Sequence, residues 1–261
     1  MSEQGNNASK RTAVDFMLAP FKPFFEDPLI TEICVNNPKE VFVERAGEWR
    51  RESVEVLTFD FLKRLGISVA TFANTNFGDT SPIVSAVLPN GERSQFVMPP
   101  ACKDETISIT IRKPSKHVKT IDNYIADGFF NHICPASTLS AQDEYRLELQ
   151  SQLNACNDPK KLVELRANFL IKCVELGKNV IIAGETGSGK TTFMKALMQA
   201  IPTDERIITI EDVPELMWGL PNHKNQVNLL YPSEATENSV ITAASLMRSC
   251  LRMKPDRILL A

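Results

Sequence analysis

The sequence predicts an α/β protein: a parallel-sheet domain in the C-terminal part, incomplete at its end, preceded by an α+β domain with an antiparallel sheet. Strand patterns separated by turn signals dominate up to Pro135, and apolar residues at helical spacing follow over 136–178. From Asn179 onward strand and helix patterns alternate, which is typical of a parallel sheet because each parallel pair needs a crossover connection. The expected parts are a disordered tail at 1–12, an N-terminal domain at 13–135, a helical linker region at 136–178 and the parallel-sheet domain at 179–261.

Within the N-terminal domain, alternating apolar residues predict antiparallel strands. Asn90-Gly91 is typical of a tight hairpin turn, and apolar residues at helical spacing predict an amphipathic helix over 58–74. The run Thr106–Arg112 alternates isoleucine with polar residues, which predicts a strand with one buried face. The strands expected in this domain are 29–36, 40–45, 83–88, 94–98 and 106–112. In the linker region, two apolar stripes separated by Asn157-Asp158-Pro159 predict a pair of helices.

Composition narrows the class of protein. The chain has 261 residues, 43% hydrophobic and 23% charged, which is ordinary for a globular protein with two cores. A net charge of −3 argues against a globally basic nucleic-acid-binding protein, so no direct nucleic-acid binding is expected. Six cysteines without a C-x-x-C pair favour reduced thiols in the cytoplasm over a zinc ribbon or a disulfide framework. Without a signal peptide or an apolar span, any membrane association is expected to be peripheral.

The most specific motif is Gly184-Glu185-Thr186-Gly187-Ser188-Gly189-Lys190-Thr191, a complete G-x-x-x-x-G-K-[ST] loop. A predicted strand at 179–183 precedes it and a predicted helix at 192–198 follows, which is the context that a phosphate-binding loop needs. The glycines let backbone N–H groups turn toward phosphate oxygens at the N-terminus of a helix. Lys190 would reach the β- and γ-phosphates, and the Thr191 hydroxyl would ligate Mg²⁺. The alternative, a glycine-rich turn that matches by accident, is disfavoured by this context.

A second candidate element is the strand pattern 206–210, which ends in Glu211 and Asp212, the first of them twenty residues beyond Thr191. Because adjacent parallel strands bring their C-terminal ends to one crevice, we expect these carboxylates near the phosphates. A carboxylate there can hold Mg²⁺ through its waters or orient the attacking water. The alternative is a solvated acidic strand end, and the upstream loop favours the catalytic interpretation.

The last residues, Arg257–Ala261, predict an apolar strand of the kind that ends in Asp or Glu in P-loop ATPases. The sequence stops where that acidic residue is expected. We therefore expect the chain to be truncated within its C-terminal domain, before the Walker B acid and the further strands of the sheet.

Two arginines of the N-terminal domain are candidates for phosphate binding. Arg112 shares the polar face of its strand with Ser108 and Thr110, and Arg93 points away from Phe96 on the neighbouring strand. Arginines on an exposed sheet face could contact nucleotide phosphates. The residues alone favour the other interpretation, solvent-exposed ion pairs.

Several segments together resemble the secretion-ATPase superfamily of type II, type IV and pilus motors. These are 182–192 and 208–216, the second of which looks like the "Asp box" of that superfamily. Three further stretches look specifically like VirB-eleven-type ATPases of bacterial type IV secretion: 27–36, 108–115 and 246–261. The chain has no tetracysteine zinc motif of the kind found in type II secretion ATPases, which favours the type IV branch.

The resemblance implies a hexameric ring in which an N-terminal domain and a RecA-like C-terminal domain clasp ATP between them. It implies that Lys190 and Glu211 belong to the catalytic apparatus and that Thr191 is the Mg²⁺ ligand. Arg93 and Arg112 look like the N-terminal-domain arginines that reach the nucleotide. The residues thereby expected to bind ATP are Gly184, Glu185, Thr186, Gly187, Ser188, Gly189, Lys190, Thr191, Thr192, Arg93 and Arg112.

The function so implied is ATP hydrolysis that powers substrate translocation and pilus biogenesis in a type IV secretion or conjugation system. The expected location is the cytoplasmic face of the bacterial inner membrane, with inner-membrane secretion ATPases and channel components as partners. Three alternatives stay open: a nucleotide-binding scaffold without turnover, a type II secretion or type IV pilus motor, and a DNA helicase. The transported substrate and the path of the linker, which decides which domains pair, also stay open.

Overall fold

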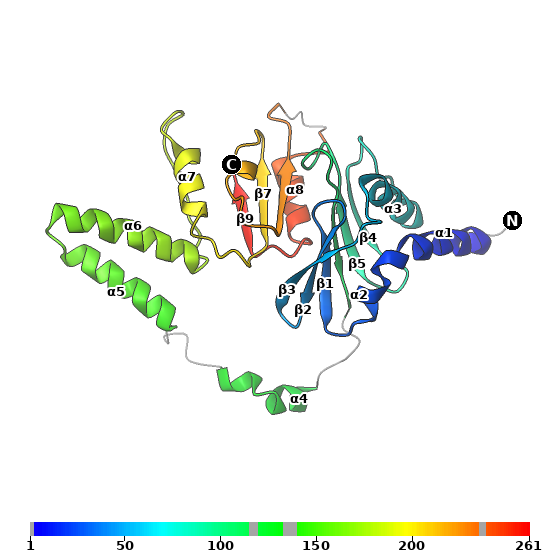
Figure 1. Ribbon diagram of the computed structural model, residues 1–261, viewed down its shortest axis with the longest axis horizontal. Coiled ribbons are helices and arrows are strands. Elements are labelled where there is room, and N and C mark those ends of the chain that lie inside the picture. Colours follow the sequence, from blue (N-terminus) through cyan, green and yellow to red (C-terminus); the bar gives the residue numbers. More distant parts are fainter. Residues whose placement is uncertain (1–2, 115–119, 133–139, 235–238) are drawn as a thin grey trace. The chain divides into compact units, whose positions relative to one another are not determined.

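The computed structural model describes residues 3–114, 120–132, 140–234 and 239–261 (Figure 1). The chain divides into two compact units, which we call the sheet unit and the helical unit. The sheet unit comprises Met1–Ser115 and Thr203–Ala261, and the helical unit comprises Lys116–Pro202. The domain boundaries expected after 135 and 178 stay predictions, because compact packing does not by itself define a domain.

The sheet unit contains a six-stranded antiparallel sheet with the strand order β3-β2-β1-β6-β5-β4. Its strands are β1 (Ile30–Val35), β2 (Glu40–Arg45), β3 (Glu48–Ser53), β4 (Ile83–Val87), β5 (Arg93–Val97) and β6 (Ser108–Arg112). This sheet confirms the α+β N-terminal part of the predicted fold. The hairpin between β4 and β5 turns at Gly91, whose φ of 96° lies in the left-handed region that glycine tolerates.

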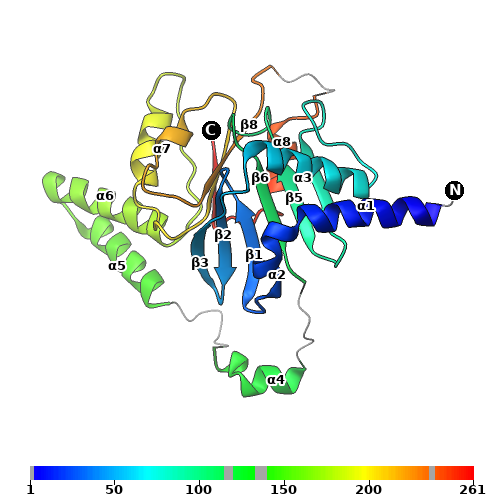
Figure 2. The same cartoon turned by 45° about the vertical axis from the view of Figure 1, so that its right-hand side comes forward.

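Helices cover one face of this sheet, as Figure 2 shows for α1 (Glu3–Met17) and α3 (Phe59–Phe72). Between α1 and β1 the chain forms η1 (Ala19–Phe21) and α2 (Lys22–Glu26). Helix α3 matches the helix predicted over 58–74 and begins at Thr58, whose hydroxyl oxygen accepts a hydrogen bond from the Phe61 N–H. Its buried side chains pack with those of the sheet in the first core, the α3 members being Leu62, Leu65, Val69 and Ala70.

The predicted disordered tail at 1–12 is wrong for the described residues, because α1 is helical from Glu3. Val14 and Leu18 are buried in the first core, and α1 packs along α3. Once packing has anchored a helix, each further residue adds one backbone hydrogen bond without a new nucleation cost. The helix therefore extends back to Glu3, through a polar segment whose own sequence does not indicate that Val14 and Leu18 anchor it.

A second, parallel sheet in the same unit has the strand order β8-β7-β9. Its elements are β7 (Ile207–Glu211), η3 (Leu216–Trp218), β8 (Gln226–Leu230), α8 (Ala243–Cys250) and β9 (Arg257–Leu260). The parallel pairing confirms the predicted C-terminal part of the fold. Ile208 and Ile210 of β7 pack with Leu246 of α8 and with Val97 and Cys102, so the two sheets share a second core.

The prediction that 106–112 buries only one face is wrong. Ser108 and Thr110 on its polar face are each 1% exposed, because the layer formed by residues 203–261 covers that face. Hydrogen bonds across the layers satisfy some of the buried polar groups there, Thr110 Oγ1 among them, whereas Ser108 Oγ has no hydrogen-bond partner among the described residues. The Gln95 amide donates to Ser249 Oγ at 3.3 Å, and the Arg206 guanidinium donates to Thr110 Oγ1 at 3.5 Å.

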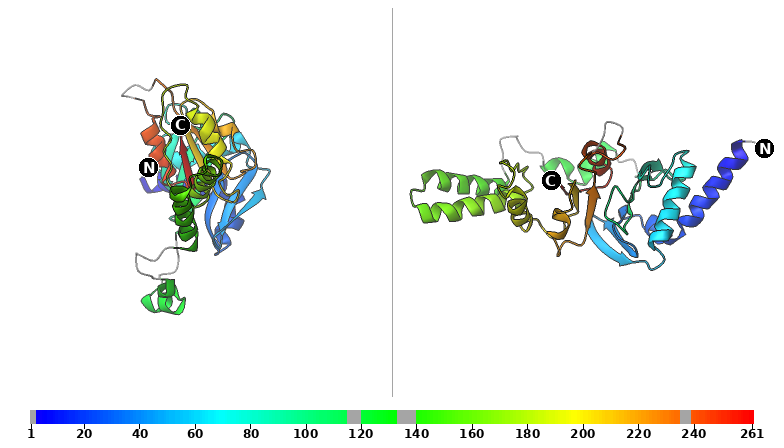
Figure 3. Two further views of the ribbon diagram at one scale, coloured as in Figure 1. Left: turned by 90° about the vertical axis from the view of Figure 1, so that its left-hand side faces the viewer. Right: turned by 90° about the horizontal axis from the view of Figure 1, so that it is seen from above.

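The helical unit contains a hairpin of two helices, which lie side by side in Figures 1 and 3. These are α5 (Ala141–Ala155) and α6 (Pro159–Glu175), as expected for the linker region, and Ser140 and Asp158 cap their N-termini. Its other helices are α4 (Ile121–Ala126), η2 (Phe129–His132) and α7 (Lys190–Met198). Nowhere in the described ranges is a helix both long and apolar enough to cross a bilayer.

The strand predicted at 179–183 is not formed. Residues 178–185 carry no regular secondary structure, and the Ile181 side chain is 93% exposed. A strand needs a neighbour to pair its backbone groups, and the described part of the helical unit consists of helices and connections only. The apolar residues of 179–183 have high β-propensity, but a strand forms only where a neighbouring strand pairs with it.

Candidate functional site

The loop 184–191 turns tightly and leads into α7. Gly187 and Gly189 have φ values of 79° and 85°, and Gly189 is the N-cap residue of the helix. The Ser188 N–H donates to the Glu185 carbonyl at 3.2 Å, and the Phe193 N–H donates to the Gly189 carbonyl at 2.9 Å. Glycines in the left-handed region at these two positions are what the G-x-x-x-x-G-K-[ST] pattern predicts.

Lys190 is the first residue of α7, and its ammonium group folds back over the loop. Its Nζ donates to the Glu185 carbonyl oxygen at 2.8 Å, so the charge lies over the concave side of the loop. Residues 184–189 are exposed. A Cβ on Gly184 would come within 2.7 Å of Ser188 Oγ, so a larger residue there would force the Ser188 side chain to move. The loop can therefore offer backbone N–H groups, a helix N-terminus and one ammonium group to a phosphate.

Thr191 lies beside Lys190 in the first turn of α7 and offers a hydroxyl oxygen to a cation. No group of three or more His, Cys, Asp or Glu side chains suited to a metal ion occurs among the described residues. Mg²⁺ usually keeps several waters and takes its remaining ligands from substrate phosphates and one or two protein oxygens. The donor set of the loop therefore fits a magnesium ion that arrives with a nucleotide, and does not fit an ion held by protein alone.

The two carboxylates at the end of β7 have different surroundings. Glu211 is fully buried, and its Oε1 accepts hydrogen bonds from the backbone N–H groups of Glu215 (2.8 Å) and Leu216. Its Oε2 accepts a third from Thr209 Oγ1 at 3.0 Å. Asp212 is exposed, and within the described ranges its Oδ1 accepts a hydrogen bond only from the Val213 N–H, at 2.8 Å. Glu211 therefore organises the turn after β7, and Asp212 is the carboxylate open to solvent.

The two candidate arginines are neighbours on adjacent strands of the six-stranded sheet. Arg93 of β5 and Arg112 of β6 are directly opposite in the antiparallel ladder. Both line a cavity of about 710 Å³ in the sheet unit, together with Arg252, Lys254 and Glu32. Like charges in opposite positions repel each other, so this arrangement favours an anion between them.

Among the described residues, Glu32 is the one carboxyl group that lines this cavity. It lies opposite Arg112 in the pairing of β1 with β6, and its Oε1 is 3.5 Å from Arg112 Nε. Its side chain is only 4% exposed, whereas that of Arg112 is 70% exposed. Burial raises the pKa of Glu32 to about 7, against the opposing effect of the Arg112 charge.

The structure thus brings Arg93 and Arg112 together, with Glu211 in the same unit and the loop 184–191 in the helical unit. Sequence reasoning missed three cavity residues, Glu32, Arg252 and Lys254. Alternation in 29–36 places Glu32 on the polar face of its strand, which was a usable signal. Nothing in the local pattern of 251–255 indicates that this segment lies beside the six-stranded sheet, because that position depends on long-range packing.

The chain is similar to proteins of bacterial secretion systems. Residues 143–261 match a family described as "Type II/IV secretion system protein". The chain is 51% identical over 257 residues to "Type IV secretion system protein VirB11" of Brucella suis, covering 97% of this chain and 68% of that protein. The protein of the same description from Bartonella henselae is 38% identical over 248 residues, covering 93% and 68%.

A solved structure is also similar over nearly the whole chain. It is the VirB11 ATPase from the Brucella suis type IV secretion system in complex with sulphate. The TM-score is 0.86 at 47% sequence identity, covering 98% of this chain and 71% of that one. Fold and sequence therefore point to the same group of proteins.

Proposed function

Because this chain belongs to the VirB11 family of type IV secretion ATPases, we propose that it binds ATP at the loop 184–191 and hydrolyses it to power substrate translocation and pilus biogenesis. The observation that carries the proposal is the geometry of that loop. Two left-handed glycines turn the backbone, and Lys190 folds over it at the start of a helix. A phosphate chain would replace the Glu185 carbonyl as the partner of the Lys190 ammonium group.

Each residue of the loop then has a distinct task. Backbone N–H groups of 184–192 hold the phosphate oxygens, and Lys190 balances the charge that develops on the γ-phosphoryl group. Thr191 supplies one oxygen to Mg²⁺, which, when bound with the nucleotide, neutralises phosphate charge. The positive end of α7 adds to the same field.

We propose that Glu211 acts as a positioning residue. Its carboxylate already accepts three hydrogen bonds from its own segment, so it holds the turn 211–216 in one conformation. Asp212 is the exposed acid of the pair and is available to accept a hydrogen bond from a magnesium-bound water. Both assignments keep this acidic segment within the catalytic apparatus.

Arg93 and Arg112 are proposed to bind phosphate oxygens of a nucleotide. They are opposite each other and line a cavity whose described lining has four cationic side chains and a single carboxyl group. Guanidinium groups bind phosphate in bidentate fashion, so two of them can hold one phosphoryl group from two sides. The ring-shaped hexamer and the contacts with inner-membrane channel components belong to the same proposal.

ATP binding and turnover by this chain test the proposal directly. Wild type should bind ATP with Mg²⁺ and turn it over, and Lys190→Ala should lose more than tenfold in turnover while remaining folded. Lys161→Ala, an exposed lysine of α6, is the matched control and should behave as wild type. Normal hydrolysis by Lys190→Ala would contradict the proposed mechanism. Tight binding with negligible turnover in wild type would favour the scaffold instead.

A further inference from the structure

Four charged residues form a single row across four neighbouring strands of the six-stranded sheet. Glu44 of β2 is opposite Glu32 of β1, Glu32 is opposite Arg112 of β6, and Arg112 is opposite Arg93 of β5. Directly opposite side chains lie on the same face, with Cβ atoms about 5 Å apart. Two acids therefore adjoin each other, two bases adjoin each other, and only the central pair has opposite charges.

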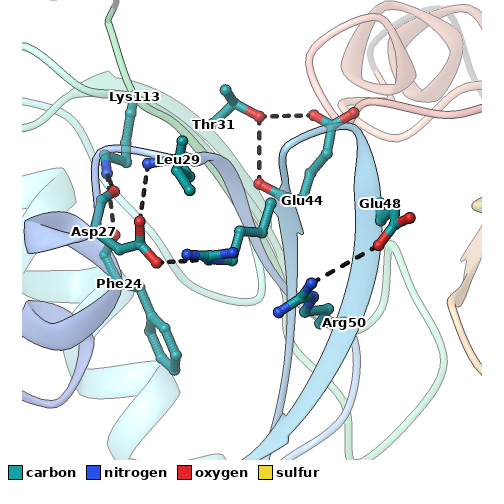
Figure 4. Close-up of polar contacts among 9 residues, drawn as sticks. Phe24, Asp27, Leu29, Thr31, Glu44, Glu48, Arg50 and Lys113 are labelled. Atoms are coloured by element: carbon teal, nitrogen blue, oxygen red, sulfur yellow. Dashed lines mark hydrogen bonds and ion pairs between the residues drawn. The ribbon is translucent and has the colours of Figure 1, made fainter.

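The outer acid of this row has partners of its own. Glu44 Oε2 accepts a hydrogen bond from Thr31 Oγ1 at 2.9 Å, which Figure 4 shows. Its Oε1 is 3.3 Å from the ammonium group of Lys254. Glu44 and Lys254 therefore balance each other at one side of the cavity. Glu32 is left with Arg112 as its ion-pair partner.

The position of Arg112 is held by the residue that follows it. Lys113 Nζ donates to the carbonyl oxygens of Phe24 (3.1 Å) and Asp27 (2.5 Å), as Figure 4 shows. The Lys113 backbone N–H donates to the Thr31 carbonyl at 2.9 Å. These bonds fix the end of β6 against β1 and α2. They hold the backbone next to Arg112 in place, while the Arg112 side chain itself is 70% exposed.

The charged groups facing Glu32 come from every element packed around it. Arg112 of β6, Lys254 after α8 and Arg206 before β7 stabilise its ionised form, and Glu44 of β2 opposes it. Arg93 and Arg252 also line the cavity. Across the described part of the chain, the Arg93 guanidinium makes no ion pair or side-chain hydrogen bond. The described lining of the cavity thus has surplus positive charge, and its one acidic group is the buried carboxyl of Glu32.

We propose that Glu32 is the resident counter-ion of this cavity, and that a phosphate-type dianion competes with it for Arg112, so that anion binding is coupled to protonation of Glu32. The inference rests on the proposal above that Arg93 and Arg112 bind phosphate oxygens. When Glu32 is ionised, Arg112 is shared between Glu32 and the anion, and the positive electrostatic potential in the cavity is lower. With Glu32 protonated, Arg112 is released to the anion and one repelling charge is gone.

The direction of the pH effect follows from linkage. A bound dianion raises the pKa of Glu32 further, because it places negative charge beside the carboxyl group. The bound state then holds more protons than the free state, so affinity for the anion rises as the pH falls through 7. Binding at pH 7.5 should take up protons, at most about three quarters of one for each anion bound, because a group with a pKa of about 7 is already about one quarter protonated there.

Sulfate is the probe for the test, because its charge does not change between pH 6 and pH 8.5. Titration calorimetry of the full chain carrying Lys190→Ala, in two buffers of different ionisation enthalpy, reports affinity and proton uptake together. We expect sulfate to bind about tenfold more tightly at pH 6 than at pH 8.5. Adding Glu32→Gln should give the tighter affinity at both pH values and abolish the proton uptake.

Control variants separate this inference from the proposed function. Glu52→Gln, an exposed acid of β3, should leave the pH dependence unchanged. Arg93→Gln and Arg112→Gln should each weaken sulfate binding at least tenfold at both pH values. If they bind sulfate as before, the phosphate role of the cavity is wrong. If they lose binding but Glu32→Gln keeps the pH dependence and proton uptake of its parent, only the counter-ion role of Glu32 is overturned.

Discussion

Arg206 Nη1 donates a hydrogen bond to Asn36 Oδ1 at 2.8 Å, which joins the residue before β7 to the residue after β1. Arg206 is fully buried, and its side chain also donates to Asn225 Oδ1 (2.6 Å), to the Met253 carbonyl (2.8 Å) and to Thr110 Oγ1 (3.5 Å). Its guanidinium also lies 5.8 Å from the centre of the Trp49 ring. One side chain thus ties both sheets of the sheet unit together through neutral acceptors.

We expect Arg206→Met to lower the free energy of unfolding of the sheet unit by about 3 kcal/mol, because it leaves buried acceptors without a donor. Urea unfolding followed by tryptophan fluorescence measures this, since Trp49 and Trp218 both belong to that unit. Arg50→Met is the control, because Arg50 is exposed and its Nη2 is 3.8 Å from Glu48 (Figure 4). Equal effects of the two substitutions would refute the assigned role of Arg206.

Backbone strain at Gly189 gives a second prediction. Its φ of 85° is unfavourable for alanine, and asparagine tolerates the left-handed region better. A Cβ there meets nothing within 4 Å, so strain and not size distinguishes the substitutions. ATP affinity, measured by titration of a fluorescent analogue, should fall in the order Gly, Asn, Ala. An alanine variant that binds as well as the asparagine variant would show that the loop conformation is not limiting.

The acidic segment gives a third prediction, which separates Glu211 from Asp212. Glu211→Ala removes the acceptor for the buried Leu216 N–H and for the Glu215 N–H, which should cost about 2–3 kcal/mol of stability. Asp212→Ala should change stability by no more than about 0.5 kcal/mol, because Asp212 is exposed. Both should reduce ATP turnover. Turnover that survives in Asp212→Ala would remove this residue from the proposed apparatus.

The raised pKa of Glu32 predicts how the stability of the sheet unit depends on pH. The pKa is about 7 in the folded state against 4.5 for the ordinary group, so the folded state binds more protons between these values. The free energy of unfolding should therefore fall as the pH rises from 4.5 to 7, by about 3 kcal/mol at most. Glu32→Gln should flatten this part of the profile in salt-free urea titrations. A profile identical to that of wild type would mean that folding does not raise the pKa of Glu32.

Local patterns were sufficient for most elements of the sheet unit. Period-two alternation predicted β1, β2, β4, β5 and β6, and Asn90-Gly91 predicted the turn between β4 and β5. The loop 184–191 was also predictable, because its motif depends on a short run of residue types whose backbone freedom is intrinsic. Whether Lys190, Thr191, Glu211, Arg93 and Arg112 perform the roles assigned to them stays a prediction.

Patterns failed where the outcome depends on what packs against a segment. The tail is helical from Glu3 because α1 packs on α3. The run 179–183 is not a strand because the described part of its unit offers no strand to pair with it. The polar face of β6 is buried because a layer from residues 203–261 covers it. In each case the deciding partner lies far away in the sequence.

By itself, then, the sequence determined the fold class, the strand directions and a phosphate-binding loop, since these follow from periodicity and from glycine at a few positions. Only the tertiary structure decided that Arg93 and Arg112 share a cavity with Glu32, Arg252 and Lys254. Strand register and interlayer packing bring those charges together, and the same burial raises the pKa of Glu32 to about 7. The electrostatics of the cavity are therefore a property of the folded sheet unit, because desolvation and charge proximity exist only after packing.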